Sequence, residues 1–349
     1  MRGSVQSDLF SSGQQSEYSF SWLGLPATRR TLPLFEAARM IPAFAKRPFQ
    51  VGRAVPAATL NPYYEVIVRL PTDEEPTEVP VGLVSKNYEL VQHLEILQRA
   101  ASILAVYELD LDHVEVSLDL TVFGERMRLG LLFPKDSKYS YTVRPGDTMG
   151  LYLEFINSVD GSLRLALRVN WLRLVCTNGL TMREVVADFS RTHLGDAVFE
   201  DFEEHLSSAM EVVEHQKLFH RWLRYRVTPD AFEEWIEKTV RRTWGLKAAV
   251  RAYHIAHRGV DVEIETMLRS VQVADIPTRD RSRVPGALTD SLSLFAISQV
   301  LAWLAGERRE LQEQLDWKRQ VYPMLAPLVR NDQQGALGFP PGMADDGVA

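Results

Sequence analysis

The chain has 349 residues and a formal net charge of −7, with 46% hydrophobic and 24% charged residues, which is the balance of an ordinary globular protein. No run of ~18 or more uncharged apolar residues occurs, so the sequence predicts neither a membrane-spanning helix nor a membrane partner. The single cysteine, Cys176, excludes an intramolecular disulfide, and with no secretory signal at the start it predicts a cytoplasmic protein.

The first sixty residues are predicted to precede the main domain. Residues 1–20 are rich in Ser, Gln and Gly, which predicts a disordered tail. Residues 21–60 contain five prolines, each of which lacks a backbone donor. This segment therefore predicts an extended Pro-rich arm with one short helix, Leu34–Met40.

Residues 61–330 are predicted to form a single α+β domain, strand-rich over 61–180 and helix-rich over 181–330. Val114–Phe123 alternates between apolar and polar residues, which is typical of a half-buried strand. Gly124 and Asp160-Gly161 predict hairpin turns, because such residues tolerate a positive φ. Further strands are predicted at 64–70, 81–84, 126–133, 149–157 and 163–176, with a helix at 90–106. Together these elements predict an antiparallel β-meander packed with helices.

The apolar period changes to 3.6 beyond residue 180, which predicts a mostly helical C-terminal half. Thr181 and Glu184 have the spacing of a capping box at a helix start. Pro229 suits the first turn of another helix. Helices are predicted at 199–226, 231–244, 288–304 and 308–329. Residues 331–349 are rich in Gly, Pro and Asp and predict a disordered tail.

Motifs with a recognisable chemistry are absent from the sequence. It contains no phosphate-binding loop, dinucleotide fingerprint, hydrolase elbow or zincin helix, so we expect no cofactor, no metal and no catalytic residue. His254 and His257 lie three residues apart on a predicted helix but lack a third ligand. Cys176 would need His193 or His220 as a base to act as a nucleophile, and the end of an apolar strand favours a packed core residue.

Charge is distributed unevenly along the chain. Asp and Glu outnumber Lys and Arg by thirteen to three in residues 61–125, whereas Lys and Arg outnumber the acids by ten to four in 217–260. Cations between aromatic residues suit single-stranded nucleic acid, and amphipathic helices with buried aromatics produce the same composition. The candidate nucleic-acid-binding residues are Lys135, Lys138, Tyr139, Tyr141 and Arg144 in a loop, and Arg221, Trp222, Arg224, Arg241 and Arg242 on helices.

Four segments resemble a known family over roughly residues 60–310. Val81–Tyr88, Asn157–Ser162, Trp171–Leu180 and Arg191–His193 are similar to the phage/plasmid-like proteins that carry domain of unknown function 932. The sequence departs from that family at Val159, where a His is usual, and at Gly179, where a bulkier residue is common. The residues of this family motif are Asn157, Asp160, Gly161, Arg173, Cys176, Asn178 and His193.

The family motif permits a purely structural interpretation and a binding interpretation. In the structural one, Asp160-Gly161 closes a hairpin and Arg173 pairs with a carboxylate across the sheet. Asn178 then bonds the backbone of the turn into the helix at Thr181. In the other, Arg173, Asn178 and His193 bind a ligand. The resemblance implies the biology of a mobile element and no particular reaction.

Three functional hypotheses remain from the sequence. The first is a mobile-element nucleic-acid-binding protein that binds or anneals single-stranded DNA in recombination or replication and self-associates into a homo-oligomer along the strand. The second is a protein-interaction or regulatory module whose acidic segment 61–125 contacts a partner. The third is an enzyme with an unrecognised site around Cys176, Asn178 and His193.

Overall fold

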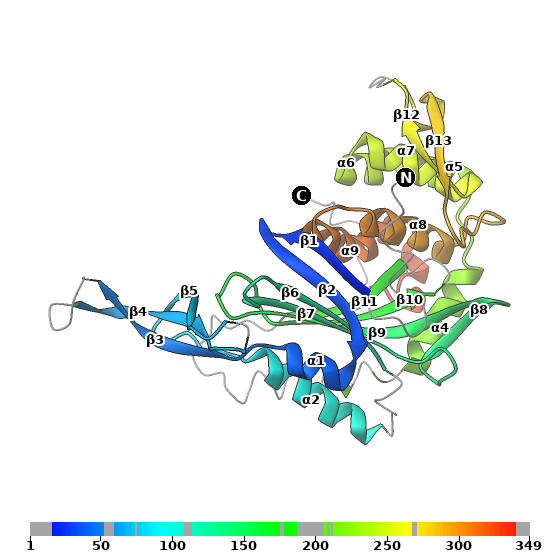
Figure 1. The fold of residues 1–349 in the computed structure, drawn as a ribbon. Coiled ribbons are helices and arrows are strands. Elements are labelled where there is room, and N and C mark those ends of the chain that lie inside the picture. The colour runs from blue at the N-terminus through cyan, green and yellow to red at the C-terminus, as the bar shows by residue number, and fades with distance from the viewer. Residues whose placement is uncertain are drawn as a thin grey trace. The chain divides into compact units, whose positions relative to one another are not determined.

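The fold is α+β, as the sequence predicts (Figure 1). The computed structural model describes residues 16–51, 59–73, 75–107, 114–174, 178–186, 206–207, 210, 212–266 and 271–339. The chain divides into two compact units. The first contains residues 1–140, 151–170 and 183–210, and the second contains residues 141–150, 171–182 and 211–349.

An eight-stranded sheet has the strand order β1-β2-β6-β7-β9-β10-β11, with β8 paired to β9 beside this path. The central meander confirms the predicted strands, and β6 matches the alternating segment 114–123. Asp119 on β6 lies opposite Arg128 on β7, which lies opposite Ile156 on β9. The bounds are β1 Ser16–Trp22, β2 Leu25–Pro33, β6 Glu115–Thr121, β7 Arg126–Leu132, β8 Ser140–Arg144, β9 Asp147–Ser158, β10 Ala166–Arg173 and β11 Asn178–Val186.

Side chains alternate between the two faces of this sheet. One face is apolar and buried, and it includes Leu118, Leu129 and Phe155. Helices α1 (Leu34–Met40) and α2 (His93–Val106) lie on one side of the sheet (Figure 1). Both helices were predicted from the sequence. Burial of the apolar stripe of α2 provides the main hydrophobic stabilisation of this helix.

A three-stranded sheet consists of β3 (Phe44–Val51), β4 (Thr59–Arg69) and β5 (Val79–Ser85). Its buried cluster contains Phe44, Ile67, Val84 and Val159. Residues 16–33 and 44–51 thus form strands where the sequence predicted a tail and an extended arm. The prolines are compatible with this pairing, because Pro48 lies on the edge strand β3 and Pro33 is the last residue of β2.

The second unit contains a bundle of helices and a two-stranded sheet. Thr228 caps α5 by accepting a hydrogen bond from Ala231 N, so the predicted helix start at Pro229 is confirmed. The bounds are α4 Val212–Arg224, α5 Pro229–Trp235, the π-turn η2 Ile236–Val240, α6 Arg241–Trp244, α7 Leu246–Arg258, β12 Val260–Ile264, η3 Val273–Asp275, β13 Thr278–Arg283, α8 Leu294–Gly306, α9 Leu311–Leu325, η4 Ala326–Leu328, η5 Asn331–Gln333 and η6 Gly335–Leu337.

Two predictions for the C-terminal half are wrong. Thr181 and Glu184 lie in β11 and not at a helix start, because pairing in the sheet overrides a short local cap signal. The predicted tail from residue 331 begins with two 3-10 turns, since Leu337 and Phe339 are buried. Within the described ranges, none of the helices has the length and apolar character that crossing a bilayer requires.

Candidate functional site

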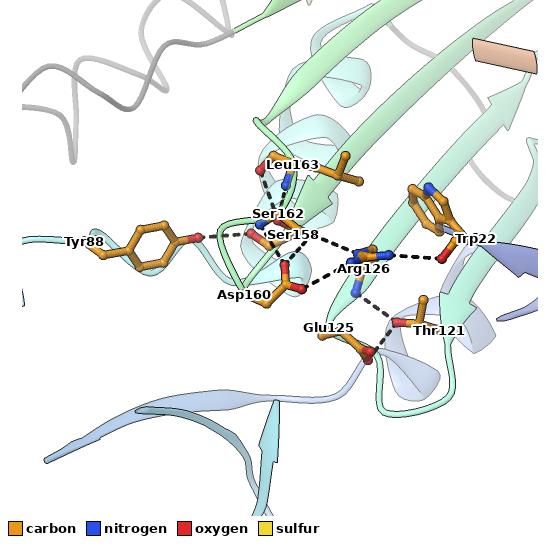
Figure 2. A network of polar contacts seen from close by, with 9 residues as sticks. All are labelled: Trp22, Tyr88, Thr121, Glu125, Arg126, Ser158, Asp160, Ser162 and Leu163. Carbon is orange, nitrogen blue, oxygen red and sulfur yellow. Dashed lines mark hydrogen bonds and ion pairs between the residues drawn. The ribbon is translucent and has the colours of Figure 1, made fainter. Parts of the chain in front are cut away.

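The turn between β9 and β10 carries the first part of the family motif, and Figure 2 shows its contacts. Asp160 Oδ1 accepts hydrogen bonds from Ser162 N at 2.9 Å and from Ser162 Oγ at 2.6 Å. Arg126 donates to Ser162 Oγ at 2.8 Å and to Trp22 O at 3.0 Å, and its guanidinium lies 3.6 Å from Asp160 Oδ2. Gly161 has φ +75°, so the predicted Asp-Gly turn is confirmed.

Tyr88 connects this turn to the segment after β5. Its hydroxyl donates to Ser158 O at 3.1 Å (Figure 2). Burial raises the pKa of Tyr88 to about 12, with a further contribution from the Asp160 carboxylate. Gly82 on β5 approaches the turn closely, because a Cβ there would lie 2.8 Å from Asp160 Cα. Only glycine therefore fits at position 82 without movement of the turn.

His93, at the start of α2, is completely buried beneath the same turn. Its Nε2 lies 2.9 Å from Gly124 O, and the Asn157 amide nitrogen lies 2.9 Å from its Nδ1 and 3.1 Å from Val91 O. Burial lowers the pKa of His93 to about 4, so the ring is neutral at pH 7. The neutral ring donates from Nε2 to the carbonyl and accepts from Asn157 at Nδ1. Sequence reasoning missed His93, because no local motif surrounds it.

A row of buried charges crosses five strands on the polar face of the large sheet. Asp119 accepts from Arg29 at 2.7 and 2.8 Å and from Arg128 at 2.7 Å. Glu154 lies 3.1 Å from Arg128 and 3.5 Å from Arg168. Desolvation of these ions is costly, and their mutual pairing offsets that cost. The row is a structural network whose side chains are almost entirely removed from solvent.

Arg173, a family-motif residue on β10, pairs with Asp147 on β9 through Nε and Nη2 of one guanidinium edge, and Nε lies 2.7 Å from Asp147 Oδ1. Arg144 approaches the same carboxylate at 3.3 Å. The predicted pairing of Arg173 with a carboxylate across the sheet is therefore confirmed. Cys176 and His193 lie outside the described residues, and so does the side chain of Asn178.

The aromatic candidates for base stacking are removed from solvent. Tyr139 is 1% exposed and packs on Phe133, and Trp222 is 0% exposed. Tyr141 is half-buried and packs on Phe219. Neither Tyr139 nor Trp222 is accessible to a base in this conformation, so their role in base stacking stays a prediction. The amphipathic interpretation holds here, because α4 turns Trp222 inward and its cations outward.

The cationic candidates are distributed over both units. Lys135 and Lys138 are exposed in the first unit. In the second unit, Arg241 pairs with Glu237 at 2.7 Å, whereas Arg224 and Arg242 are exposed and have no carboxylate partner among the described residues. Arg221 is exposed and donates to the backbone oxygen of Ala336.

Neither histidines nor carboxylates form a metal centre in the ranges that the structure covers, where no group of three or more His, Cys, Asp or Glu could hold an ion. His257 packs on Phe232 and Tyr253, and His254 contacts Arg258. A pocket of about 250 Å³ on α5 and η2 is lined by Asp230, Glu233, Glu234 and Glu237, so it would repel a phosphate.

One family model matches the chain, and it is described as "Domain of unknown function (DUF932)". The match covers residues 80–261, which include the turn at 157–162, the Arg173 strand and helix α4. No curated protein and no solved structure matches the chain significantly. Because the matched segment is more than half of the chain, this protein belongs to the DUF932 family.

Proposed function

We propose that this protein binds nucleic acid, with single-stranded DNA as the first candidate, through the exposed cationic face of α4. Lys217, Arg221 and Arg224 are exposed and follow one another at spacings of four and three residues, so they lie on one face of the helix. The exposed Arg226 lies two residues after the end of the helix. This row of cations is the observation on which the proposal depends.

The competing contacts of these cations are weak. Glu214 pairs with Lys217 at 2.7 Å, but both side chains are more than half exposed, and such pairs contribute about 0–1 kcal/mol. Arg221 and Arg226 donate to a backbone oxygen and to the Ser291 hydroxyl, which are neutral acceptors. A phosphate offers each guanidinium a charged, bidentate acceptor instead.

The mechanism follows from the burial of Phe219 and Trp222, which leaves no exposed Phe, Tyr or Trp ring beside these cations in the described part of α4. Phosphates are neutralised and counterions are released, while the bases remain available to a second strand. Such backbone binding suits an annealing protein that acts in the recombination or replication of a mobile element. Several copies arranged as a homo-oligomer would cover a long strand.

The test is fluorescence anisotropy of a labelled oligonucleotide at two salt concentrations. Arg224→Gln should weaken binding and reduce the salt slope by about 0.7, the value of one phosphate contact on a single strand. Arg309→Gln is the matched control, because Arg309 is exposed and follows the C-terminal end of α8.

The control lies at the opposite end of α8 from Arg226. Arg226 pairs with Ser293, just before the start of α8, and this helix of 13 residues is about 20 Å long. Both substitutions change the net charge equally. Equal losses of affinity would therefore indicate that the overall charge of the protein, and not a site on α4, attracts the oligonucleotide. Absence of binding at low salt would refute the proposal.

The acidic segment 61–125 supports the alternative, a protein-interaction module, less well. Asp119 is buried between arginines, and Glu65 and Glu78 pair with Lys46 and Arg47 at 2.7 and 2.5 Å. These carboxylates are therefore partly neutralised within the first unit. A stoichiometric partner protein that remains bound after nuclease treatment would favour the alternative.

A further inference from the structure

The residues after α9 form a short segment that lies against α4, and we name residues 334–339 the C-terminal strap. Gly335, Ala336 and Gly338 are exposed, whereas Leu337 and Phe339 are buried. The strap thus runs along the surface of the second unit with three buried side chains, those of Gln334, Leu337 and Phe339. Its ordered structure departs from the disordered tail that composition predicted.

Three consecutive carbonyl oxygens of the strap accept hydrogen bonds from side chains of the helices. Arg221 donates to Ala336 O, the indole Nε1 of Trp222 donates to Leu337 O at 2.9 Å, and the Tyr322 hydroxyl donates to Gly338 O. A row of oxygen acceptors therefore faces a guanidinium, an indole N–H and a phenol. These are donors that also bind phosphates and base edges.

The ring of Phe339 packs in the manner of a stacked base. It lies 5.7 Å from Trp222 with an interplanar angle of 6°, and 4.7 Å from Tyr322 with an angle of 22°. Trp222 and Tyr322 are themselves 6.1 Å apart at 28°. Without Phe339, the two remaining rings would provide a nearly parallel aromatic surface beside Arg221.

We infer that the C-terminal strap is an autoinhibitory segment that occupies a nucleobase site formed by Trp222 and Tyr322. This inference rests on the proposed function, because the phosphates of the same strand would contact the cations of α4. With the strap displaced, one base stacks on the two rings and Arg221 exchanges the Ala336 carbonyl for a phosphate, while the bases outside this site remain available to a second strand. The site then selects unpaired bases, since paired bases cannot reach the rings.

The hydrogen bonds and glycines of the strap allow it to detach from α4 without unfolding of the helices. Its internal hydrogen bonds are local, from Leu337 N and Phe339 N to Gln334 O and from Gly338 N to Gly335 O. Two glycines give it backbone freedom, and Gly338 has φ +84°. The chain before it is held separately, because the Tyr225 hydroxyl contacts both Leu328 O and Arg330 N. The strap can therefore move away from the helices while the chain up to Arg330 stays in place.

The experiment compares the full chain with two truncated chains. A chain ending at Gln333 lacks the strap, and a chain ending at Phe339 keeps it and serves as the control. The chain without the strap should bind a labelled single-stranded oligonucleotide about tenfold more tightly, since a base then stacks on the exposed rings. Its affinity for duplex should change much less. Binding should also quench the fluorescence of Trp222. Trp222→Phe in the same truncated chain should therefore reduce the total quenching of tryptophan fluorescence by the contribution of this residue.

Full-length variants avoid dependence on truncation. Phe339→Ala removes the stacked ring, and Gly338→Ala strains the strap, because the backbone has positive φ and a Cβ would lie 3.2 Å from Leu218. Both variants should bind single strands more tightly than the wild type. A synthetic peptide of residues 330–339 should compete with the oligonucleotide for the chain that ends at Gln333.

The outcomes separate this inference from the proposed function. Equal affinities of the strapless chain, the control and the full chain would overturn the inference alone. Loss of a cooperative melting transition in Phe339→Ala would also overturn it, because a removable strap must be dispensable for folding. Failure of every chain to bind at low salt would refute the proposed function as well.

Discussion

The side-chain amide of Asn157 donates to Nδ1 of His93 across 2.9 Å, and this contact joins the end of β9 to the start of α2. The same amide donates to Val91 O at 3.1 Å. One side chain of the family motif thus donates to two buried acceptors, Val91 O just before α2 and His93 Nδ1 at its first residue. Buried acceptors that lose their donor carry a full desolvation cost.

Replacement of Asn157 by Ala should lower the free energy of unfolding by about 2–3 kcal/mol, because Val91 O and His93 Nδ1 both lose their donor. Urea denaturation followed by circular dichroism measures this change. Asn87→Ala is the matched control, since Asn87 is exposed and should alter stability by less than about 0.5 kcal/mol. Equal effects of the two substitutions would contradict the role of Asn157.

The buried imidazole of His93 should make the free energy of unfolding depend on pH in the acidic range. Its pKa falls from 6.5 to about 4 on folding, so the unfolded chain binds more protons between these values. Stability is therefore complete above pH 6.5 and should fall by about 3 kcal/mol as the pH decreases to 4. Urea midpoints at pH 7, 5.5 and 4.5 test this. The slope should be smaller in His93→Gln, and an unchanged slope in that variant would assign the effect to other groups.

Asp119 should be among the most sensitive carboxylates for stability. Asp119→Asn replaces the buried carboxylate that Arg29 and Arg128 share by a neutral amide, while Arg128 keeps Glu154, and this change should cost about 3–5 kcal/mol. Glu234→Gln is the control, because the pair of Glu234 with Lys238 is exposed and contributes at most about 1 kcal/mol. Thermal unfolding of both variants gives the comparison, and a small effect at Asp119 would show that the row of charges is dispensable.

Glu115 should destabilise the folded protein at alkaline pH. Burial raises its pKa to about 7, and its Oε1 has no hydrogen-bond partner in the described part of the chain. The folded state binds more protons than the unfolded state between pH 4.5 and 7, so stability falls as the pH rises through this range. Glu115→Gln should gain about 1 kcal/mol at pH 8 and almost nothing at pH 4, since partial exposure screens the effect. An equal gain at both pH values would exclude titration of Glu115 as the cause.

Local patterns in the sequence were sufficient to identify many of the individual elements. The alternation of Val114–Phe123 predicted β6, and Asp160-Gly161 predicted the turn whose glycine has φ +75°. Both signals act within a few residues, because strand pleating and turn geometry depend on neighbouring side chains. Thr181 and Glu184 show the limit of such signals, since a capping pattern occurs within β11.

Tertiary structure decided which side chains are available for function. Arginines and aromatics alternate along 217–244, and composition alone left their orientation open. Packing turned Trp222 toward Phe339 and left Arg224 exposed, because burial of a large ring is favourable and burial of an unpaired guanidinium is not. The sequence alone determined the family, the fold class and the local turns, whereas contacts between residues such as Trp222 and Phe339, which are distant along the chain, set the surface on which any ligand must bind.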